Sequence, residues 1–122
     1  MIYIACDHGG YEVKLKVIKL LEKHKLEFED LGTNTTDSVD YPDYAEKLAN
    51  KVIENKQSVG ILICRTGIGM SIAVNRFRGV RGALCRSVRD AFFARSHNNA
   101  NVLVLGSSGC NRLRRKIIKT FL

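Results

Sequence analysis

The chain has 122 residues, of which 45% are apolar and 26% are charged, with one proline and a formal net charge of +8. This length and composition predict a single domain, residues 1–122, that folds without disulfides or a structural metal. No apolar run reaches the roughly 18 residues of a membrane span, and the N-terminus lacks the features of a secretory signal. We therefore expect a cytoplasmic protein that does not bind membranes.

The charge is unevenly distributed along the chain. Residues 1–61 carry 8 lysines against 11 acidic residues, a net charge of −3, whereas residues 62–122 carry 12 lysines and arginines against Asp90 alone, a net charge of +11. A basic half of this kind indicates an anionic partner, such as nucleic acid, an acidic protein surface or a phosphorylated small molecule. A solvated basic surface is an equally good interpretation.

Short apolar segments alternate with helical patterns along the whole chain. Strands are predicted at residues 2–6, 26–30, 59–64, 80–85 and 102–105. The first helix carries an apolar stripe of Val13, Val17, Leu20 and Leu21, and the second begins at Tyr41 and carries a stripe from Ala45 to Ile53. Further helices are predicted at about 69–77, at about 87–96 and from about 111 to the C-terminus.

This alternation predicts an α/β protein. Strands that are apolar on both faces need helices on both sides of a parallel sheet. We therefore expect a three-layer αβα sandwich with a Rossmann-like five-stranded parallel sheet. In such sheets ligands bind beyond the carboxyl ends of the strands, so the residues that follow each strand are the candidates for a site.

The segment after the third predicted strand is the strongest candidate. It reads Cys64, Arg65, Thr66, Gly67, Ile68, Gly69, and a helix follows. A glycine-rich turn that enters a helix directs backbone N–H groups at one point, where an oxyanion or phosphate fits. The turn is neither a dinucleotide fingerprint nor a P-loop, because the third glycine and the Gly-Lys-Ser/Thr ending are absent.

Cys64 stands immediately before this turn. The helix terminus and Arg65 place positive potential beside it, which favours the thiolate and makes this cysteine a candidate base or nucleophile. The alternative is a small buried strand residue. The four cysteines, Cys6, Cys64, Cys85 and Cys110, form no C-x-x-C pair, so we expect reduced thiols and neither a disulfide framework nor a zinc site.

Asp7 and His8 follow the first strand and are expected in the same crevice. The carboxylate can orient or deprotonate a substrate hydroxyl, and the imidazole can bind an anion or transfer protons. Alternatively, the pair caps the first helix. A metal site that combines His8 with the cysteines at the strand ends is not supported by the spacing, and no metal or other cofactor is expected.

His97 and Asn98 come after the fourth predicted helix. If this helix runs antiparallel to the strands, these residues emerge at the opposite end of the sheet from Cys64. They can then join the crevice only from a second subunit, which predicts a homodimer with two equivalent shared sites. A histidine that interacts with the C-terminal end of a helix is the alternative.

Taken together, these segments resemble a known family, the type B ribose-5-phosphate isomerases and the related galactose-6-phosphate isomerase subunits. The motifs that carry the resemblance span most of the chain. They are CDHGG at residues 6–10, SVDYPDYA at 38–45, GILIC at 60–64, TGIGMS at 66–71 and HNNANVL at 97–103.

The resemblance implies a cofactor-free aldose–ketose isomerase of the pentose phosphate pathway, acting on a phosphorylated sugar through an enediolate. Cys64 would be the base and the Thr66 to Gly69 backbone would stabilise the oxyanion. His97 would assist ring opening, and Asp7 would engage the ring oxygen or hydroxyls. His8 and Asn98 would bind substrate. The family's sites are shared between subunits of a homodimer, with a tetramer as a further possibility.

The sequence departs from the family at several positions. Arg65 stands where the family has glycine, Ser108 stands where an arginine contacts phosphate, and Val88-Arg89 replaces a proline-tyrosine step. The sequence also ends at Leu122, before the arginine-bearing tail of the family. The long side chain of Arg65 can either crowd the anion-binding turn or replace a phosphate ligand, and Arg112, Arg114 and Arg115 are further candidates for that ligand.

Three alternatives to a ribose-5-phosphate isomerase follow from these features. One is a galactose-6-phosphate or other hexose-phosphate isomerase subunit. Another is a flavodoxin-like module that binds a phosphorylated ligand without catalysis. The last, nucleic-acid binding by the basic half, is not expected, because the sequence lacks aromatic stacking motifs and a recognisable nucleic-acid-binding fold.

Overall fold

The computed structural model describes all 122 residues. The strands are β1 (Ile2–Cys6), β2 (Phe28–Asp30), β3 (Val59–Cys64), β4 (Gly82–Leu84) and β5 (Val102–Gly106). The α-helices are α1 (Tyr11–Lys23), α2 (Tyr41–Glu54), α3 (Ile68–Val74), α4 (Val88–Ser96) and α5 (Asn111–Phe121), and a short 3-10 helix, η1 (His8–Gly10), precedes α1. All strand pairs are parallel, in the order β2-β1-β3-β5-β4.

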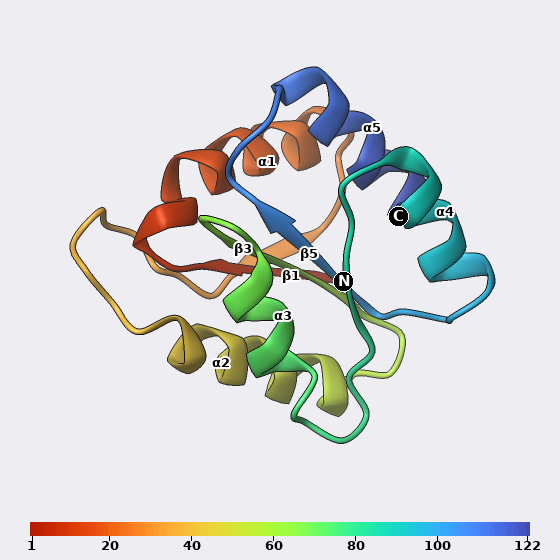
Figure 1. Cartoon of the computed structure of the whole chain (residues 1–122), viewed down its shortest axis with the longest axis horizontal. Helices are drawn as coiled ribbons and strands as arrows, with labels where there is room; N and C mark the ends of the chain where they lie inside the picture. The colour runs from red at the N-terminus through yellow and green to blue at the C-terminus, as the bar shows by residue number, and fades with distance from the viewer.

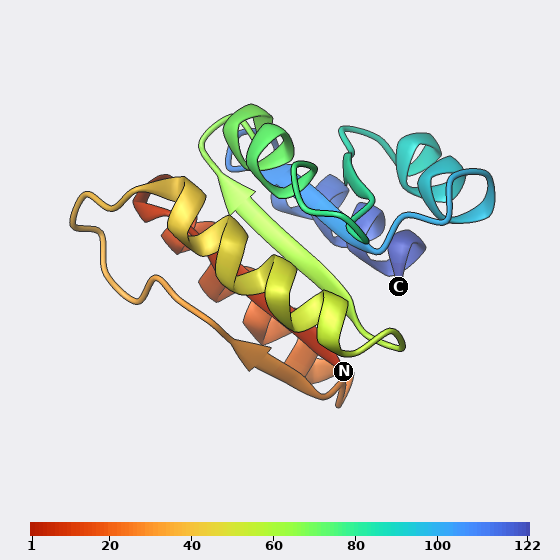
Figure 2. The same ribbon diagram turned by 90° about the horizontal axis from the view of Figure 1, so that it is seen from below.

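Helices cover both faces of this sheet. In Figure 1, α1 and α5 lie above the strands while α2 and α3 lie below them, and Figure 2 shows the α2 and α3 side from below. Successive side chains of β3 point to opposite faces, so that Ile61 and Ile63 join the core under α1 and α5, whereas Leu62 joins the core over α2. The predicted three-layer αβα sandwich with a five-stranded parallel sheet is confirmed.

The second strand is shorter than predicted, because the first helix uses part of the segment to terminate. Lys25 adopts a left-handed conformation with φ 55°. The N–H groups of Lys25 and Leu26 then bond to the carbonyl oxygens of Glu22 and Leu21, which is a Schellman C-cap. The strand therefore begins at Phe28 rather than at residue 26.

Other boundaries shift by one to three residues. The helix predicted at 69–77 runs over Ile68–Val74, because the Asn75 side chain turns back to bond both main-chain groups of Gly82, with N–O distances of 2.8 and 3.0 Å. Gly82–Leu84 replaces the longer strand predicted at 80–85, and the last strand extends to Gly106. Ser87 caps α4 by accepting the Asp90 N–H at 3.0 Å.

The packing of α1 against the sheet predicts a large difference between two leucines of the same helix. Leu21 is fully buried, whereas Leu15 is exposed. Leu21→Ala should lower the free energy of unfolding by about 2–5 kcal/mol, because it leaves a cavity in the core. The control, Leu15→Ala, should change it by less than about 0.5 kcal/mol. Urea unfolding measures both, and similar losses would contradict this packing.

Candidate active site

The carboxyl ends of β1, β3 and β5 lie together, and the loops that follow them are bonded to one another. The Asp7 N–H donates to the Ile63 carbonyl oxygen at 3.2 Å, and the Ser107 N–H donates to the Arg65 carbonyl oxygen at 3.0 Å. The loops after β1 and β5 are therefore both tied to the end of β3. This is the place at which parallel α/β sheets bind ligands.

A left-handed glycine makes the bend between β3 and α3. Gly67 has φ +79°, and a Cβ there would come within 2.5 Å of Leu84 Cδ1 and 3.1 Å of the Leu105 carbonyl carbon. Both the dihedral angle and the lack of space require glycine. Thr66 Oγ1 accepts the Ile68 N–H at 3.2 Å and closes the turn.

The sulfur of Cys64 accepts a hydrogen bond from this bend. The Gly67 N–H points at Cys64 Sγ with an N–S distance of 3.1 Å. Cys64 is only 5% exposed and packs in the core on the α2 and α3 side. An N–H aimed at sulfur stabilises negative charge there, which is what a cysteine needs to act as a base.

The other buried cysteines at strand ends have the opposite environment. Cys6 Sγ donates to the Thr33 carbonyl oxygen at 3.8 Å, and Cys85 Sγ donates to the Ala83 carbonyl oxygen at 3.6 Å. Burial raises the pKa of both thiols from 9.0 to about 11. Neither of these two sulfurs accepts a main-chain N–H, whereas Cys64 Sγ accepts that of Gly67.

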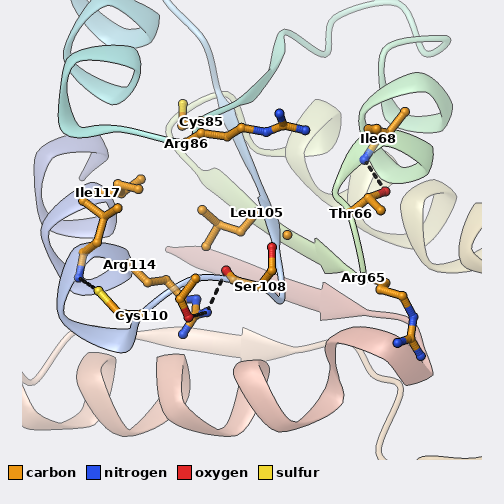
Figure 3. Close-up of a pocket in the computed structure, with 13 residues that line it drawn as sticks. Arg65, Thr66, Ile68, Cys85, Arg86, Leu105, Ser108, Cys110, Arg114 and Ile117 are labelled. Carbon is orange, nitrogen blue, oxygen red and sulfur yellow. Dashed lines mark hydrogen bonds between the residues drawn. The ribbon is translucent and has the colours of Figure 1, made fainter.

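Two cavities adjoin the bend. The first has a volume of about 540 Å³, and Thr66, Ile68 and Arg86 are among the residues that line it (Figure 3). The second, of about 400 Å³, is lined by His8 and Lys16 among others. Arg65 and Arg114 line both cavities, so the region beside the bend is strongly basic. Cys64 directly precedes Arg65 in the sequence but does not itself line either cavity.

Asp7 and His8 lie on the first loop of this region. Asp7 is buried, and its Oδ1 accepts the Gly10 N–H at 3.1 Å, so it caps η1 as the alternative interpretation expects. His8 Nδ1 accepts the Val39 N–H at 3.1 Å. Because Nδ1 is an acceptor, the proton of the neutral ring is on Nε2, which leaves His8 a donor on its other side.

His97 and Asn98 lie at the other end of the sheet. They follow α4 and precede β5, whose first residue, Val102, pairs with Gly60, whereas Cys64 pairs with Gly106. Both are exposed, and the His97 ring packs edge-on against Phe93, with 4.6 Å between centroids. The expected position is therefore found, and a single chain does not bring these residues to Cys64.

Sequence reasoning missed the structural use of Arg114. This residue is buried, and its guanidinium donates to the carbonyl oxygens of Ser107, Ser108 and Gly109 at 3.1–3.3 Å. Burial also lowers its pKa. Arg114 therefore holds the loop after β5, and Figure 3 shows its side chain beside Ser108. Its place on the buried stripe of α5, three residues before Ile117, is the signal that identifies it.

No three His, Cys, Asp or Glu side chains gather in a group that could hold a metal ion. None of the helices is both long enough and apolar enough to span a membrane.

Comparisons with known proteins agree with this architecture. A family described as Ribose/Galactose Isomerase matches residues 2–122. The ribose-5-phosphate isomerase B of Escherichia coli is 41% identical over 106 residues, which cover 87% of this chain and 71% of that protein.

Solved structures are similar over almost the whole chain. A ribose 5-phosphate isomerase from Thermotoga maritima superposes with a TM-score of 0.95 at 50% identity, covering 98% of this chain and 83% of that one. The ribose-5-phosphate isomerase B of Mycoplasma genitalium, solved with bound ribulose-5-phosphate, gives 0.93 at 41% identity, covering 98% and 81%.

The fold and these similarities define an aldose–ketose isomerase. The chain belongs to the ribose/galactose isomerase family, and the similar proteins named above are ribose-5-phosphate isomerases of type B.

The contrast between the cysteines predicts their order of alkylation. A thiol with a pKa of about 11 is ionised to only about 0.1% at pH 8, so Cys6 and Cys85 should resist iodoacetamide there. Their labelling should rise about tenfold for each pH unit up to about 11, because the thiolate reacts. We expect Cys64 to be the first of the three to be labelled at pH 8, as mapped by peptide mass spectrometry. Labelling of Cys6 or Cys85 at the same rate as Cys64 at pH 8 would contradict the proposed difference between these thiols.

Proposed function

We propose that this chain interconverts ribose 5-phosphate and ribulose 5-phosphate, with Cys64 as the base. The hydrogen bond from the Gly67 N–H to Cys64 Sγ, at the ligand-binding end of a parallel sheet, is the observation that carries the proposal. The family and its named relatives support the choice of reaction.

The proposed reaction moves one proton between neighbouring carbons. The Cys64 thiolate removes the proton from C2 of the open-chain aldose, and the electrons flow through C1 to the carbonyl oxygen, which gives an enediolate. The backbone N–H groups of the Thr66 to Gly69 bend stabilise this oxyanion. Transfer of the hydroxyl proton from O2 to O1, and return of the first proton to C1, give the ketose. No cofactor takes part.

The remaining site residues bind substrate and open the sugar ring. In this proposal Asp7 engages the ring oxygen or a hydroxyl, and His8 donates a hydrogen bond through Nε2, since its Nδ1 is occupied by the Val39 N–H. His97 is the acid that protonates the ring oxygen, and Asn98 contacts the sugar oxygens.

Arg65 is proposed to bind the phosphate group. It lines both cavities beside the bend, and Lys16 and His8 line one of them with it. Arg114 is less suited to this role, because its guanidinium is bonded to three carbonyl oxygens. A planar cation such as Arg65 can bind phosphate in a bidentate way.

We infer that the active enzyme is a homodimer with shared sites, and that a tetramer would form from two such dimers. One chain separates Cys64 from His97, so a second copy must supply His97 to complete the site. Exposed apolar side chains support this arrangement, because Ile68 and Ile72 lie beside the bend and Phe92 lies on the helix that leads to His97. A subunit contact would cover them. The four free thiols fit a reducing compartment such as the cytoplasm.

Cys64→Ala should abolish isomerisation and leave the protein folded. Loss of a positioned base lowers kcat by about 10²–10⁴-fold. The assays are ribulose 5-phosphate formation and exchange of the C2 proton of ribose 5-phosphate in D₂O, followed by NMR. Cys110→Ala is the matched control, because this exposed thiol faces the first turn of α5, and it should keep its activity. A Cys64→Ala variant with the parental rate would exclude the thiolate base.

Mixed dimers test the shared site. With cyclic ribose 5-phosphate as substrate, Cys64→Ala should be inactive and His97→Ala should be strongly impaired, but random mixing of the two subunits places one intact site in each mixed dimer. Since about half of the dimers are mixed, about a quarter of the parental activity should return. No recovery, when mass spectrometry confirms that mixed dimers form, would show that both residues act within one subunit.

His97→Ala should also slow the cyclic substrate more than the open-chain form, since its role is ring opening. Equal loss on both forms would remove that role.

A further inference from the structure

Lys14 is a fully buried cation that the proposed reaction does not use. It lies in the first turns of α1, on the same side as Val17 and Leu21, where apolar residues are expected. Its ammonium donates to Asp30 Oδ1 and Oδ2 at 2.7 and 2.9 Å, to Asn34 Oδ1 at 3.0 Å and to the Thr33 carbonyl oxygen.

All of these acceptors belong to one short segment, residues 30–34, which begins at the last residue of β2. A buried ammonium is strongly destabilising unless it is paired and its hydrogen bonds are made. Asp30 supplies the counter-charge, and its Oδ1 also accepts the Gly32 N–H at 2.9 Å. The need to satisfy Lys14 therefore restricts where residues 30–34 can lie.

The same segment is bonded to the end of β1, directly before Asp7 and His8. The Thr33 N–H donates to the Cys6 carbonyl oxygen at 3.0 Å, and the Cys6 N–H donates to the Gly32 carbonyl oxygen at 2.8 Å. The segment then leads to Val39, whose N–H donates to His8 Nδ1. Lys14 thus binds the start of the connection between β2 and α2, and the end of the same connection binds His8. Figure 1 shows this connection as the long loop that passes the start of α1.

We propose that Lys14 is a positioning residue for His8. By holding residues 30–34 against the end of β1, its ammonium keeps the Val39 N–H on His8 Nδ1, and so keeps the Nε2 proton directed at the cavity beside Arg65. The consequence for catalysis rests on the proposed function, whereas the effect on the His8 ring does not.

Lys14→Met tests this proposal, because it keeps the length of the side chain and removes the charge and the donors. The imidazole ¹⁵N shifts should change from the Nε2–H pattern to a mixture of tautomers, and the Val39 amide should exchange faster with solvent. We expect kcat/KM for ribose 5-phosphate to fall about ten- to a hundredfold at a temperature where the protein is folded. Lys19→Met, at an exposed position of the same helix, should change none of these quantities.

The outcomes separate the two proposals. If Lys14→Met only lowers the unfolding temperature and leaves the His8 shifts and kcat/KM unchanged, Lys14 is merely structural and the inference is wrong. If the parental enzyme does not isomerise ribose 5-phosphate, the proposed function fails, and the His8 shifts still test the positioning role. Should Lys14→Met not fold, Asn34→Ala removes a single acceptor and should give a smaller change of the same kind, while unchanged His8 shifts in this variant would overturn the inference.

Discussion

The site depends on the hydrogen bond between the Gly67 N–H and Cys64 Sγ. This bond forms because the chain reverses directly after a buried strand, with a left-handed glycine wedged between Leu84 and Leu105. The pairing of β5 with both β3 and β4 brings the Leu105 main chain and the Leu84 side chain to this glycine, so the environment of the Cys64 sulfur depends on the order of the strands. The proposed reaction needs such an arrangement, because a preorganised backbone must stabilise the charge that develops on the sugar.

Buried cations hold the loops around this bend. Lys14 in α1 binds the segment after β2, and Arg114 in α5 binds three carbonyl oxygens of the loop after β5. Both residues lie near the start of a helix, and the two helices cover the same face of the sheet. Both donate hydrogen bonds to carbonyl oxygens of loops at strand ends, which would otherwise lack partners. The positive charge of the second half of the chain is thus partly structural, while Arg65 lines the cavities beside the bend and is available for an anion.

The architecture and the position of the bend could be predicted from the sequence, because both follow from short-range patterns. Strands such as β3 are apolar on both faces, and the glycines after Cys64 mark a turn into a helix. The end of α1 could not be predicted, since the left-handed residue of its C-cap is Lys25 rather than glycine. Lys14 was not identified either, because a lysine on an apolar stripe shows its partners only when residues distant in sequence are folded against it. The position of His97 relative to Cys64 followed from helix direction, but its role depends on a second subunit.

A complex with a phosphorylated hydroxamate that mimics the enediolate would test the central claim most directly. If Cys64 is the base, a crystal structure should place its sulfur about 3.5 Å from the hydroxamate carbon and nitrogen, which stand for C2 and C1 of the sugar. The hydroxamate oxygen should accept N–H groups of the bend between Thr66 and Gly69. A ligand whose hydroxamate carbon and nitrogen lie away from the sulfur, with Cys64 still covered by Gly67, would contradict the account.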